Sequence, residues 1–462
     1  MNVKLIAHVA LVLSAFAASG ALEFGQEVGK VKPVNGVGQG PLRGWDDYRL
    51  FHYLKDAGIP YARLHDVGGA FGKNVFVDIP NVFRDFDADE TKAENYDFAF
   101  TDRYLKALVA NGVEPYYRLG VTIENAQHVK AYRIHPPKDF AKWARICEHV
   151  IRHYTEGWAN GYRMKISHWE IWNEPENFET IQRNQMWKAP FSEYIRLYEV
   201  ASRHLKAKFP HLKIGGYAGC GFYGVSSSWA KPDNARIVFL HKSFTDFLAA
   251  CRDRKLPLDF FSFHCYDYAE HAERQIAYCR RTLDEYGFKD TEMSLNEWLP
   301  CRGGGTAAMC GTARQAADIA AMLAVLQNGP VDDAEIYDAR ATGGGYAPLF
   351  APDALRPRKA YYVFTAFNEL RKLGRALGAP KMPDGLYACA ATDGKGRYAL
   401  LVSNPTKDSV DVDFSVPGRE IESARVIDAN RDYGTLDAHG LRAIGPETVL
   451  LVVYGKAGPS LI

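Results

Sequence analysis

The sequence lacks the patterns that mark several common classes of protein. Its charges nearly cancel, with 56 Lys and Arg against 55 Asp and Glu, so no overall field favours nucleic acid or an anionic membrane. It contains no Cys-x-x-Cys pair, no zinc-ligand spacing, no internal repeat of fixed period and no low-complexity tract,. We therefore expect no nucleic-acid partner, no metal and no cofactor.

Cysteine is present but scattered, and the first one is Cys147. Lipid attachment at a mature N-terminal cysteine is therefore not expected. Cys301 and Cys310 flank a Gly-rich loop and could form a disulfide in an exported protein,. Scattered buried thiols fit the spacing of the eight cysteines equally well. Oligomeric state is not predicted by any pattern in the chain.

The N-terminus has the three-part pattern of a secretory signal peptide. Lys4 gives an early positive charge, an apolar run extends from about Leu5 to Ala18, and small residues follow at 19–21. The apolar run is short for a membrane span, although an uncleaved anchor is the alternative. We expect residues 1–21 to be removed and the mature protein to be secreted or periplasmic, without a membrane partner.

Between about Val34 and Leu373, eight apolar strand patterns alternate with helical patterns. Apolar residues of the helical stretches recur at spacings of three and four. This alternation predicts an α/β fold with a parallel sheet, and eight units close into a (β/α)8 TIM barrel. An open doubly wound sheet is the alternative. The predicted strands are Val34–Val37, Tyr61–Asp66, Glu114–Gly120, Ser167–Glu174, Lys213–Ala218, Phe260–Tyr266, Glu292–Trp298 and Ala334–Ala339. The predicted helices are Asp46–Ala57, Asp102–Ala110, Lys138–Tyr154, Phe191–Lys208, Ile237–Arg254, Ala269–Tyr286, Thr312–Gln327 and Arg358–Leu373.

After Leu373 the helical period disappears and short strand patterns alternate with turn residues. This texture predicts a smaller C-terminal antiparallel β-sandwich. Its predicted strands are Gly385–Ala391, Tyr398–Asn404, Val410–Val416, Ser423–Asp428 and Glu447–Tyr454. The expected organisation is a signal peptide over 1–21, an N-terminal segment over 22–33 that could add an edge strand to the sandwich, a barrel over 34–376 and the sandwich over 377–462.

Two carboxylic acids lie at the strand ends where barrels carry their active residues. Glu174 ends the fourth strand before Pro175, and Glu297 ends the seventh strand before Pro300. These strands lie on opposite sides of the mouth, so the side chains could approach to about 5–5.5 Å, the spacing of retaining glycosidases. One acid would protonate the leaving oxygen and the other would attack the anomeric carbon. Rim residues in structural salt bridges are the alternative for each.

Five segments in order carry a resemblance to a known family. They are ARLHDVGG (62–69), YDFAFTDRYLKALVANGVEPYYRLG (96–120), WEIWNEPE (169–176), LNEWLP (295–300) and RPRKAYYVFTAFNELRKLG (356–374). Asn-Glu-Pro after strand four and Glu-Trp after strand seven resemble clan A glycoside hydrolases, and the five together are similar to glycoside hydrolase family 39. That resemblance implies a retaining exo-glycosidase, acting on a carbohydrate through a covalent glycosyl-enzyme.

The resemblance also implies roles for individual residues. Glu174 would be the acid/base, Glu297 the nucleophile, and Asn173 the partner of the sugar 2-hydroxyl. Arg63 would help to keep Glu297 ionised, and His65 would contact the sugar. His264 and Tyr266 would flank the nucleophile, and Tyr337 and Asp338 would shape the pocket floor.

Several of these residues have a plainer interpretation. His65 and His264 could be core histidines that bind backbone groups. Trp298 could stack on a sugar or pack inside the barrel. Arg118, at the end of strand three, could bind an acidic group on the substrate or form a solvated ion pair.

The identity of the sugar is the least determined feature. The resemblance favours terminal β-xylose, and α-L-iduronic acid, β-galactose and α-L-arabinose also occur in the family. The chain departs from the family pattern at Asp66, at Arg118 and in the segment IYDARATGGG (336–345), all where sugar hydroxyls would be read. An endo-acting polysaccharide hydrolase and a non-catalytic carbohydrate-binding barrel are the alternative functions.

Overall fold

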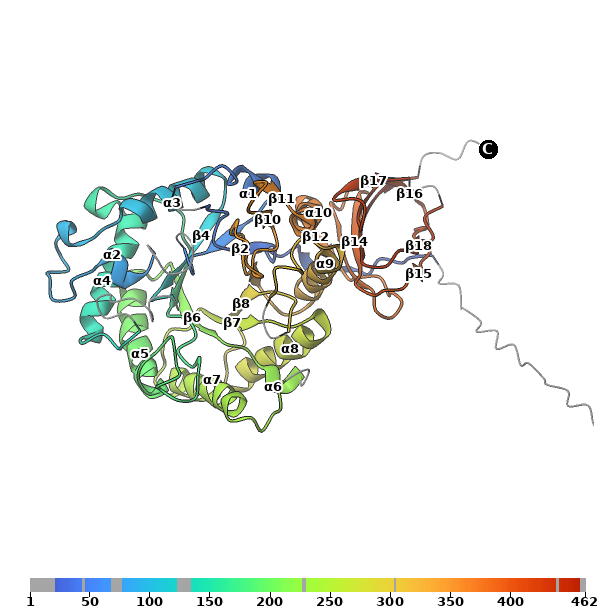
Figure 1. The fold of residues 1–462 in the computed structure, drawn as a ribbon. Coiled ribbons are helices and arrows are strands. Elements are labelled where there is room, and N and C mark those ends of the chain that lie inside the picture. The colour runs from blue at the N-terminus through green and yellow to red at the C-terminus, as the bar shows by residue number, and fades with distance from the viewer. Residues whose placement is uncertain are drawn as a thin grey trace, which may run out of the picture.

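The computed structural model shows a closed parallel barrel ringed by helices, with a smaller β-domain beside it (Figure 1). It describes residues 21–43, 46–67, 77–122, 134–226, 230–302, 305–437 and 440–457. The fold predicted from the sequence, a (β/α)8 TIM barrel with a C-terminal antiparallel β-sandwich, is confirmed. The predicted signal peptide lies outside the described residues, apart from its last position.

The barrel closes because its last strand, β9, pairs in parallel with its first, β2. This closure excludes the open doubly wound sheet. The strands are β2 (Gly36–Gly38), β3 (Tyr61–Arg63), β4 (Glu114–Leu119), β5 (His168–Ile171), β6 (Lys213–Gly219), β7 (Phe260–Cys265), β8 (Glu292–Trp298) and β9 (Asp333–Ile336). Their side chains alternate between the barrel interior and the surrounding helices, and nearly all are buried.

The ring of helices covers the outer face of the barrel (Figure 1). They are α1 (His52–Asp56), α3 (Ala99–Ala110), α4 (Phe140–Thr155), α5 (Phe191–Lys208), α7 (Ala235–Asp253), α8 (Ala269–Glu285), α9 (Ala313–Asn328) and α10 (Lys359–Leu373). The short helices α2 (Ile79–Val82) and α6 (Tyr223–Ser226) lie in the segments after β3 and β6, and 3-10 turns occur at Ala93–Asn95 and Trp158–Asn160. A hairpin of β10 (Phe350–Ala351) and β11 (Arg356–Pro357) precedes α10.

The helix predicted over Asp46–Ala57 was too long, since α1 spans five residues. Asp47 forms an antiparallel bridge with Arg43. Its carboxylate also accepts a hydrogen bond from the backbone N–H of Arg49 at 3.2 Å. These local bonds hold the segment in a turn and compete with helical hydrogen bonding.

The β-domain consists of a seven-stranded antiparallel sheet that faces a two-stranded one. Apolar residues from both sheets, among them Val402, Phe414, Ile444 and Val452, form its core. The large sheet contains β1 (Glu27–Lys30), β12 (Arg375–Leu377), β13 (Tyr387–Thr392), β14 (Tyr398–Asn404), β16 (Arg419–Ile427), β17 (Gly434–Leu436) and β19 (Thr448–Lys456); the small one contains β15 (Val410–Asp411) and β18 (Ala443–Ile444). β1 is the edge strand beside β12, so the N-terminal segment belongs to the β-domain.

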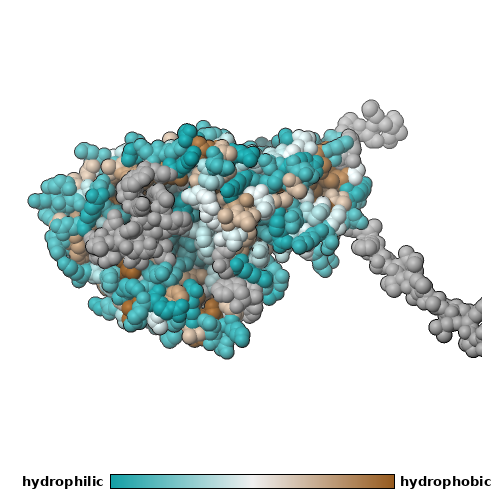
Figure 2. Space-filling view, in the orientation of Figure 1, coloured by the Kyte–Doolittle hydropathy of each residue, from teal (hydrophilic) through white to brown (hydrophobic). Residues whose placement is uncertain are grey.

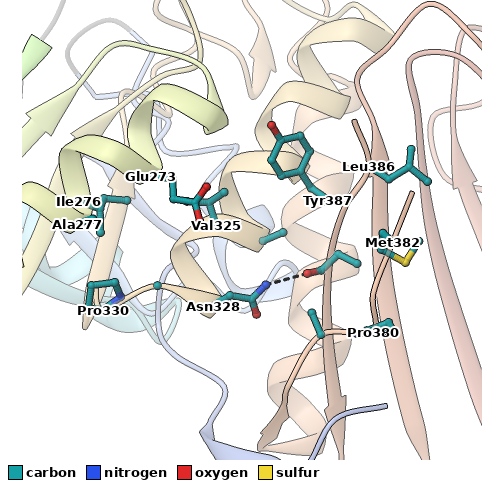
Figure 3. Close-up of a pocket in the computed structure, with 14 residues that line it drawn as sticks. Glu273, Ile276, Ala277, Val325, Asn328, Pro330, Pro380, Met382, Leu386 and Tyr387 are labelled. Atoms are coloured by element: carbon teal, nitrogen blue, oxygen red, sulfur yellow. Dashed lines mark hydrogen bonds between the residues drawn. The ribbon is translucent and has the colours of Figure 1, made fainter. Parts of the chain in front are cut away.

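Helices α9 and α10 connect the barrel to the large sheet. Ser403 Oγ in β14 donates to the carbonyl of Ala317 in α9 at 2.6 Å. At the edge of the junction, Asn328 Nδ2 donates to the carbonyl of Ala388 at 2.9 Å (Figure 3). Helix α9 is buried at nearly every position, because the barrel covers one side and the β-domain covers the other.

All eight cysteines are free thiols, so the disulfide considered between Cys301 and Cys310 is not formed. Hydrophilic residues predominate on the face drawn in Figure 2, and the hydrophobic ones there are scattered. No helix among the described residues has the length and apolar content to cross a bilayer.

Two glycine positions allow the energetic cost of close packing to be measured apart from the cost of backbone strain. A Cβ on Gly215 in β6 would lie 2.2 Å from the carbonyl oxygen of Phe260 in β7, whereas a Cβ on Gly112 would meet nothing within 4 Å although its φ is +75°. We expect Gly215→Ala to lower the free energy of unfolding by about 3 kcal/mol, because two barrel strands must separate. Gly112→Ala should cost about 1 kcal/mol, from the left-handed backbone alone. Denaturant unfolding of both variants measures the difference, and equal losses would contradict the close-packing argument.

Candidate active site

Glu174 and Glu297 face one another at the C-terminal end of the barrel. A carboxylate oxygen of each and a ring nitrogen of His264 all lie within 4.8 Å of one another. The side chains of Glu174 and Glu297 are 17% and 8% exposed, so both can be reached from the mouth. This proximity fits the separation of about 5–5.5 Å in retaining glycosidases better than the roughly 6.5–9.5 Å of inverting ones.

A local departure from strand geometry turns Glu174 into the mouth. Trp172 and Glu174 have φ values of 76° and 43°, a left-handed region that non-glycine residues adopt at a cost. Trp172 packs outward against Trp143 of α4, while Asn173 and Glu174 both turn inward. The backbone N–H of Glu174 then donates to the carbonyl of Ala218 at 3.0 Å, which fixes the acid at the end of β5.

Glu297 reaches the mouth through an irregularity in β8. The register of β8 against β9 shifts between Leu295 and Trp298. A bulge allows consecutive side chains to face the same side of a sheet, and here Asn296 binds Glu170 while Glu297 binds Arg63. Both side chains therefore point into the barrel.

Arg63 connects three strands beneath the two acids. Its Nε donates to Glu170 Oε2 at 2.9 Å, its Nη1 to Glu297 Oε2 at 3.1 Å, and its Nη2 to Asn173 Oδ1 at 2.6 Å. Arg63 and Glu170 are both buried, so each charge requires the other. No motif in the sequence assigned a role to Glu170.

Tyr266 and His264, at the end of β7, bind the two acids from one side. The Tyr266 hydroxyl donates to Glu297 Oε1 at 2.5 Å. His264 Nδ1 lies 2.8 Å from Glu174 Oε1, and its Nε2 lies 3.6 Å from Glu297 Oε2. Asn177, also missed from the sequence, donates through Nδ2 to Glu174 Oε2 at 2.7 Å.

The two acids differ in the balance of burial and hydrogen bonding. Burial raises the pKa of Glu297, and the charges of His264 and Arg63 oppose the shift. Burial also acts to raise the pKa of Glu174, but hydrogen bonds from a charged His264 and from Asn177 outweigh it, so the net shift is downward. A neutral ring protonated at Nε2 reverses the bond, because Nδ1 then accepts from a protonated Glu174.

Three tyrosine rings form one wall of the site. The ring centroids of Tyr266, Tyr337 and Tyr346 lie 5.6–6.2 Å apart in edge-to-face contacts. The Tyr337 hydroxyl donates to the carboxylate of Asp66. This wall therefore offers aromatic edges and a buried carboxylate, and Tyr346 had no signal in the sequence.

His65 and Asp338 lie in the same region but are largely enclosed. Burial lowers the pKa of His65 well below its ordinary value, so its ring is neutral, with Nε2 3.3 Å from Asp66 Oδ1. Asp338 accepts two hydrogen bonds from the Arg340 guanidinium at 2.6 and 2.8 Å. Asp338 is thus committed to an ion pair beside the tyrosine wall.

Arg118 and Trp298 do not present their side chains at the surface of the site, since both are fully buried. Arg118 Nη2 donates to Asp78 Oδ1 at 2.5 Å, and its Nε and Nη1 have no hydrogen-bond partner within the described part of the chain.

A further buried acid, Glu176, lies two residues beyond Glu174. Its Oε1 accepts the backbone N–H of Cys220 at 2.7 Å, and its Oε2 has no partner among the described residues. Burial raises the pKa of Glu176 to about 8, with repulsion from Glu174 adding to the shift. Glu176 is therefore mainly protonated at neutral pH.

Among the residues that the structure describes, two groups of side chains have the spacing of metal ligands, namely Glu174, His264 and Glu297 in the site and His168, Glu292 and Asp333 at the opposite end of the barrel. Each already has a positive partner. Arg63 donates to Glu297, and Lys213 Nζ lies 2.6 and 2.7 Å from the two oxygens of Glu292. The arrangement is that of ion-paired carboxylates.

A separate cavity of about 370 Å³ opens at the junction of α8, α9 and the β-domain (Figure 3). Most of the residues that line it have apolar or small side chains, and Glu273 is the one carboxylic acid among them. A glycosidase needs two opposed carboxyl groups, so this cavity is not the candidate active site.

Residues 34–286 match the family model described as "Glycosyl hydrolases family 39". The chain belongs to this family. A β-xylosidase from Geobacillus stearothermophilus is 29% identical over 224 residues, which cover 46% of this chain and 39% of that protein. The matched region is thus well under half of that relative's length.

Solved structures support the fold assigned to this family 39 chain. A glucosidase from Croceicoccus marinus superposes with a TM-score of 0.69 at 18% identity, covering 95% of this chain and 99% of that one. A monomeric β-xylosidase from Caulobacter crescentus CB15 gives 0.67 at 17% identity, covering 95% and 100%. At these identities the likeness concerns the fold.

The buried acid Glu176 predicts a pH-dependent stability. Its pKa rises from 4.5 to about 8 on folding, so the native state keeps a proton that the unfolded chain releases. Wild-type stability should therefore fall, relative to Glu176→Gln, by about 1.4 kcal/mol per pH unit within that window. Denaturant unfolding of the two proteins at several pH values from 5 to 8 measures the divergence. Parallel curves would show that Glu176 ionises normally in the native state.

Proposed function

We propose that this family 39 member is a retaining exo-glycosidase with Glu174 as acid/base and Glu297 as nucleophile. The observation that carries the proposal is the approach of their carboxylate oxygens to within 4.8 Å across the barrel mouth,. The β-xylosidase relative supports terminal β-xylose as the sugar. The substrate is then a carbohydrate with an accessible non-reducing end.

In the first step, Glu297 attacks the anomeric carbon while Glu174 gives its proton to the glycosidic oxygen. The bond between the anomeric carbon and that oxygen breaks, and a covalent glycosyl-enzyme forms on Glu297. Arg63 and the Tyr266 hydroxyl donate to the Glu297 carboxylate, which favours its ionised form and holds it for attack.

In the second step, Glu174 acts as a base. It removes a proton from water, the oxygen of that water attacks the anomeric carbon, and Glu297 leaves as a carboxylate. Two inversions give overall retention, and the proton on Glu174 is restored. Water must enter from the Glu174 side, since Glu297 occupies the opposite face of the sugar.

His264 lies between the two acids and can form a hydrogen bond with each. In the arrangement that suits the proposed roles, its Nδ1 accepts a hydrogen bond from protonated Glu174 and its Nε2–H points toward Glu297. Glu174 then carries the proton and Glu297 is ionised.

Asn173 is positioned to read the sugar 2-hydroxyl. Its Oδ1 accepts a hydrogen bond from Arg63 at 2.6 Å, which leaves the Nδ2 group as the donor toward the substrate. A hydrogen bond to the 2-hydroxyl strengthens in the transition state. Arg63 thus orients this amide as well as the nucleophile.

The predicted signal peptide at residues 1–21 leads us to propose that the enzyme works outside the cytoplasm, secreted or in the periplasm. Polysaccharide fragments are available there as substrates. Its charge balance, +1 overall, provides no long-range attraction for polyanions.

Azide distinguishes the two carboxylates. We expect Glu297→Ala to lose activity on the order of 10⁵-fold or more and to recover with azide as a glycosyl azide of inverted configuration. Glu174→Ala should lose roughly 10²–10⁴-fold and yield a glycosyl azide of retained configuration. NMR of the azide products is the measurement. The opposite pairing would exchange the two roles, and full activity of Glu297→Ala would exclude it as nucleophile. A non-catalytic carbohydrate-binding barrel would show no activity even in the wild type.

The sugar is identified by a set of aryl glycosides. We expect the β-xyloside to give the highest kcat/KM, above the β-galactoside, the α-L-arabinosides and the α-L-iduronide.

An exo-enzyme should also release single sugars from one end of a linear oligosaccharide, because it binds the terminal sugar and does not need the further subsites of an open cleft. Early release of mid-chain fragments would instead indicate an endo-acting hydrolase.

A further inference from the structure

A second cavity, of about 600 Å³, is lined by residues that follow β5 and β6, at the end of the barrel that carries the acid/base. One part of its wall comes from the segment after β5, which contributes Phe178 and Arg183. The facing part comes from α6 and the start of α7, including Tyr223, Arg236 and Leu240. The cavity is therefore built on the two segments that follow β5 and β6, at the same end of the barrel as the active site.

Hydrogen bonds connect this wall to the two acids through one intervening residue each. Arg236 Nε donates to the carbonyl of Asn177 at 3.0 Å, and Asn177 Nδ2 donates to Glu174 Oε2 at 2.7 Å. The Tyr223 hydroxyl accepts the backbone N–H of Tyr266 at 3.0 Å, and the Tyr266 hydroxyl donates to Glu297. Two lining residues, Arg236 and Tyr223, thus contact residues that bind the acids.

The position of the cavity decides which part of a substrate it can hold. A general acid protonates the glycosidic oxygen, so the departing group lies on the side of Glu174. The sugar that forms the covalent intermediate lies over Glu297, on the other side of that bond. A cavity connected to Glu174 through Arg236 and Asn177 can therefore receive the leaving group.

Two guanidinium groups share one aromatic ring in this wall. The Cζ atoms of Arg183 and Arg236 lie 4.0 and 4.8 Å from the centroid of the Phe178 ring. A guanidinium over a ring keeps its in-plane N–H donors available for a planar anion. The ring therefore holds two such donor groups near each other.

The charges along the cavity favour an anion. Lys231 is a third cation in the lining, against the acids Glu179 and Asp233. Glu179 Oε1 lies 3.7 Å from Arg183 Nη1, beyond hydrogen-bonding distance, so Arg183 can turn toward a ligand. Tyr223, Ile237 and Leu240 add apolar surface on which the face of a sugar ring can pack,.

We propose that this cavity is a leaving-group subsite for an anionic unit, a sugar that carries a carboxylate or a sulfate. Arg183 and Arg236 bind the anion, and Phe178 holds the two guanidinium groups in place. The proposal rests on the proposed function, since it requires Glu174 to be the acid. It adds that the preferred substrate carries a negative charge on its leaving group.

The test compares leaving groups that differ in charge and little in shape. One pair of β-xylosides carries 3-carboxyphenyl or 3-carbamoylphenyl, and a second pair carries 3-sulfophenyl or 3-sulfamoylphenyl. We expect kcat/KM to be roughly tenfold higher for the charged member, as for a charge-assisted hydrogen bond. The charged ring is the poorer leaving group, so intrinsic reactivity works against this preference. The pair with the larger ratio identifies carboxylate or sulfate as the ligand.

Two arginine variants make the comparison specific. Arg183→Met should bring the charged-to-neutral ratio close to one. Arg196→Met on α5 is the matched control, because both side chains are 64% exposed and each lies near a glutamate and an aromatic ring. The control should keep the wild-type ratio. Sodium chloride should also reduce the preference, since exposed charges are screened.

The outcomes separate this proposal from the function on which it rests. Turnover of the neutral glycosides at rates equal to the charged ones, in wild type at low salt, would overturn the subsite and leave the glycosidase intact. If no glycoside is turned over, the proposed function fails, and the anion site is then tested by ligand binding alone. Methyl β-D-glucuronide should then raise the unfolding temperature more than methyl β-D-glucoside in wild type but not in Arg183→Met, and equal shifts would overturn it.

Discussion

The site depends on one buried positive charge, the guanidinium of Arg63. It balances Glu170 and Glu297 and orients Asn173, and these partners come from β5 and β8 while Arg63 belongs to β3. Taking such ions out of water costs several kcal/mol each, which close pairing offsets, and breaking a buried pair typically costs about 3–5 kcal/mol. Barrel stability and the ionisation of the nucleophile are therefore maintained by the same contacts. A change at any of these positions alters both the fold and the chemistry.

Much of the fold could be predicted because local signals agreed with the global topology. The limits of α5, β8 and β14 coincide with those predicted, since clear periodicity or alternation ends there at turn residues. The prediction failed for α1, where hydrogen bonds of Asp47 replace helical ones. The strand expected over Val410–Val416 is formed at Val410–Asp411. Short-range side-chain bonds of this kind have no periodic signature.

Sequence motifs located the two acids of the site but did not predict which residues would contact them. Alternation would have placed Trp172 and Glu174 on one face, and the left-handed backbone at both positions reverses that. The inward position of Glu170 follows from alternation with His168, yet its pairing with Arg63 depends on strands far apart in the chain. The complete burial of Arg118 and Trp298 likewise depends on packing between elements. Packing between elements distant in the chain thus determined which of the candidate residues reach the active site.

The burial of α9 between the barrel and the β-domain has a consequence for how this architecture can change. Most faces of that helix are apolar and buried. A polypeptide that ended after α10 would therefore expose a large hydrophobic surface to water, and such surfaces promote aggregation. The β-domain also contains β1 from the start of the chain, which ties both ends of the polypeptide to one sheet. Recombination among relatives must therefore exchange the two domains together, or rebuild α9 at the same time.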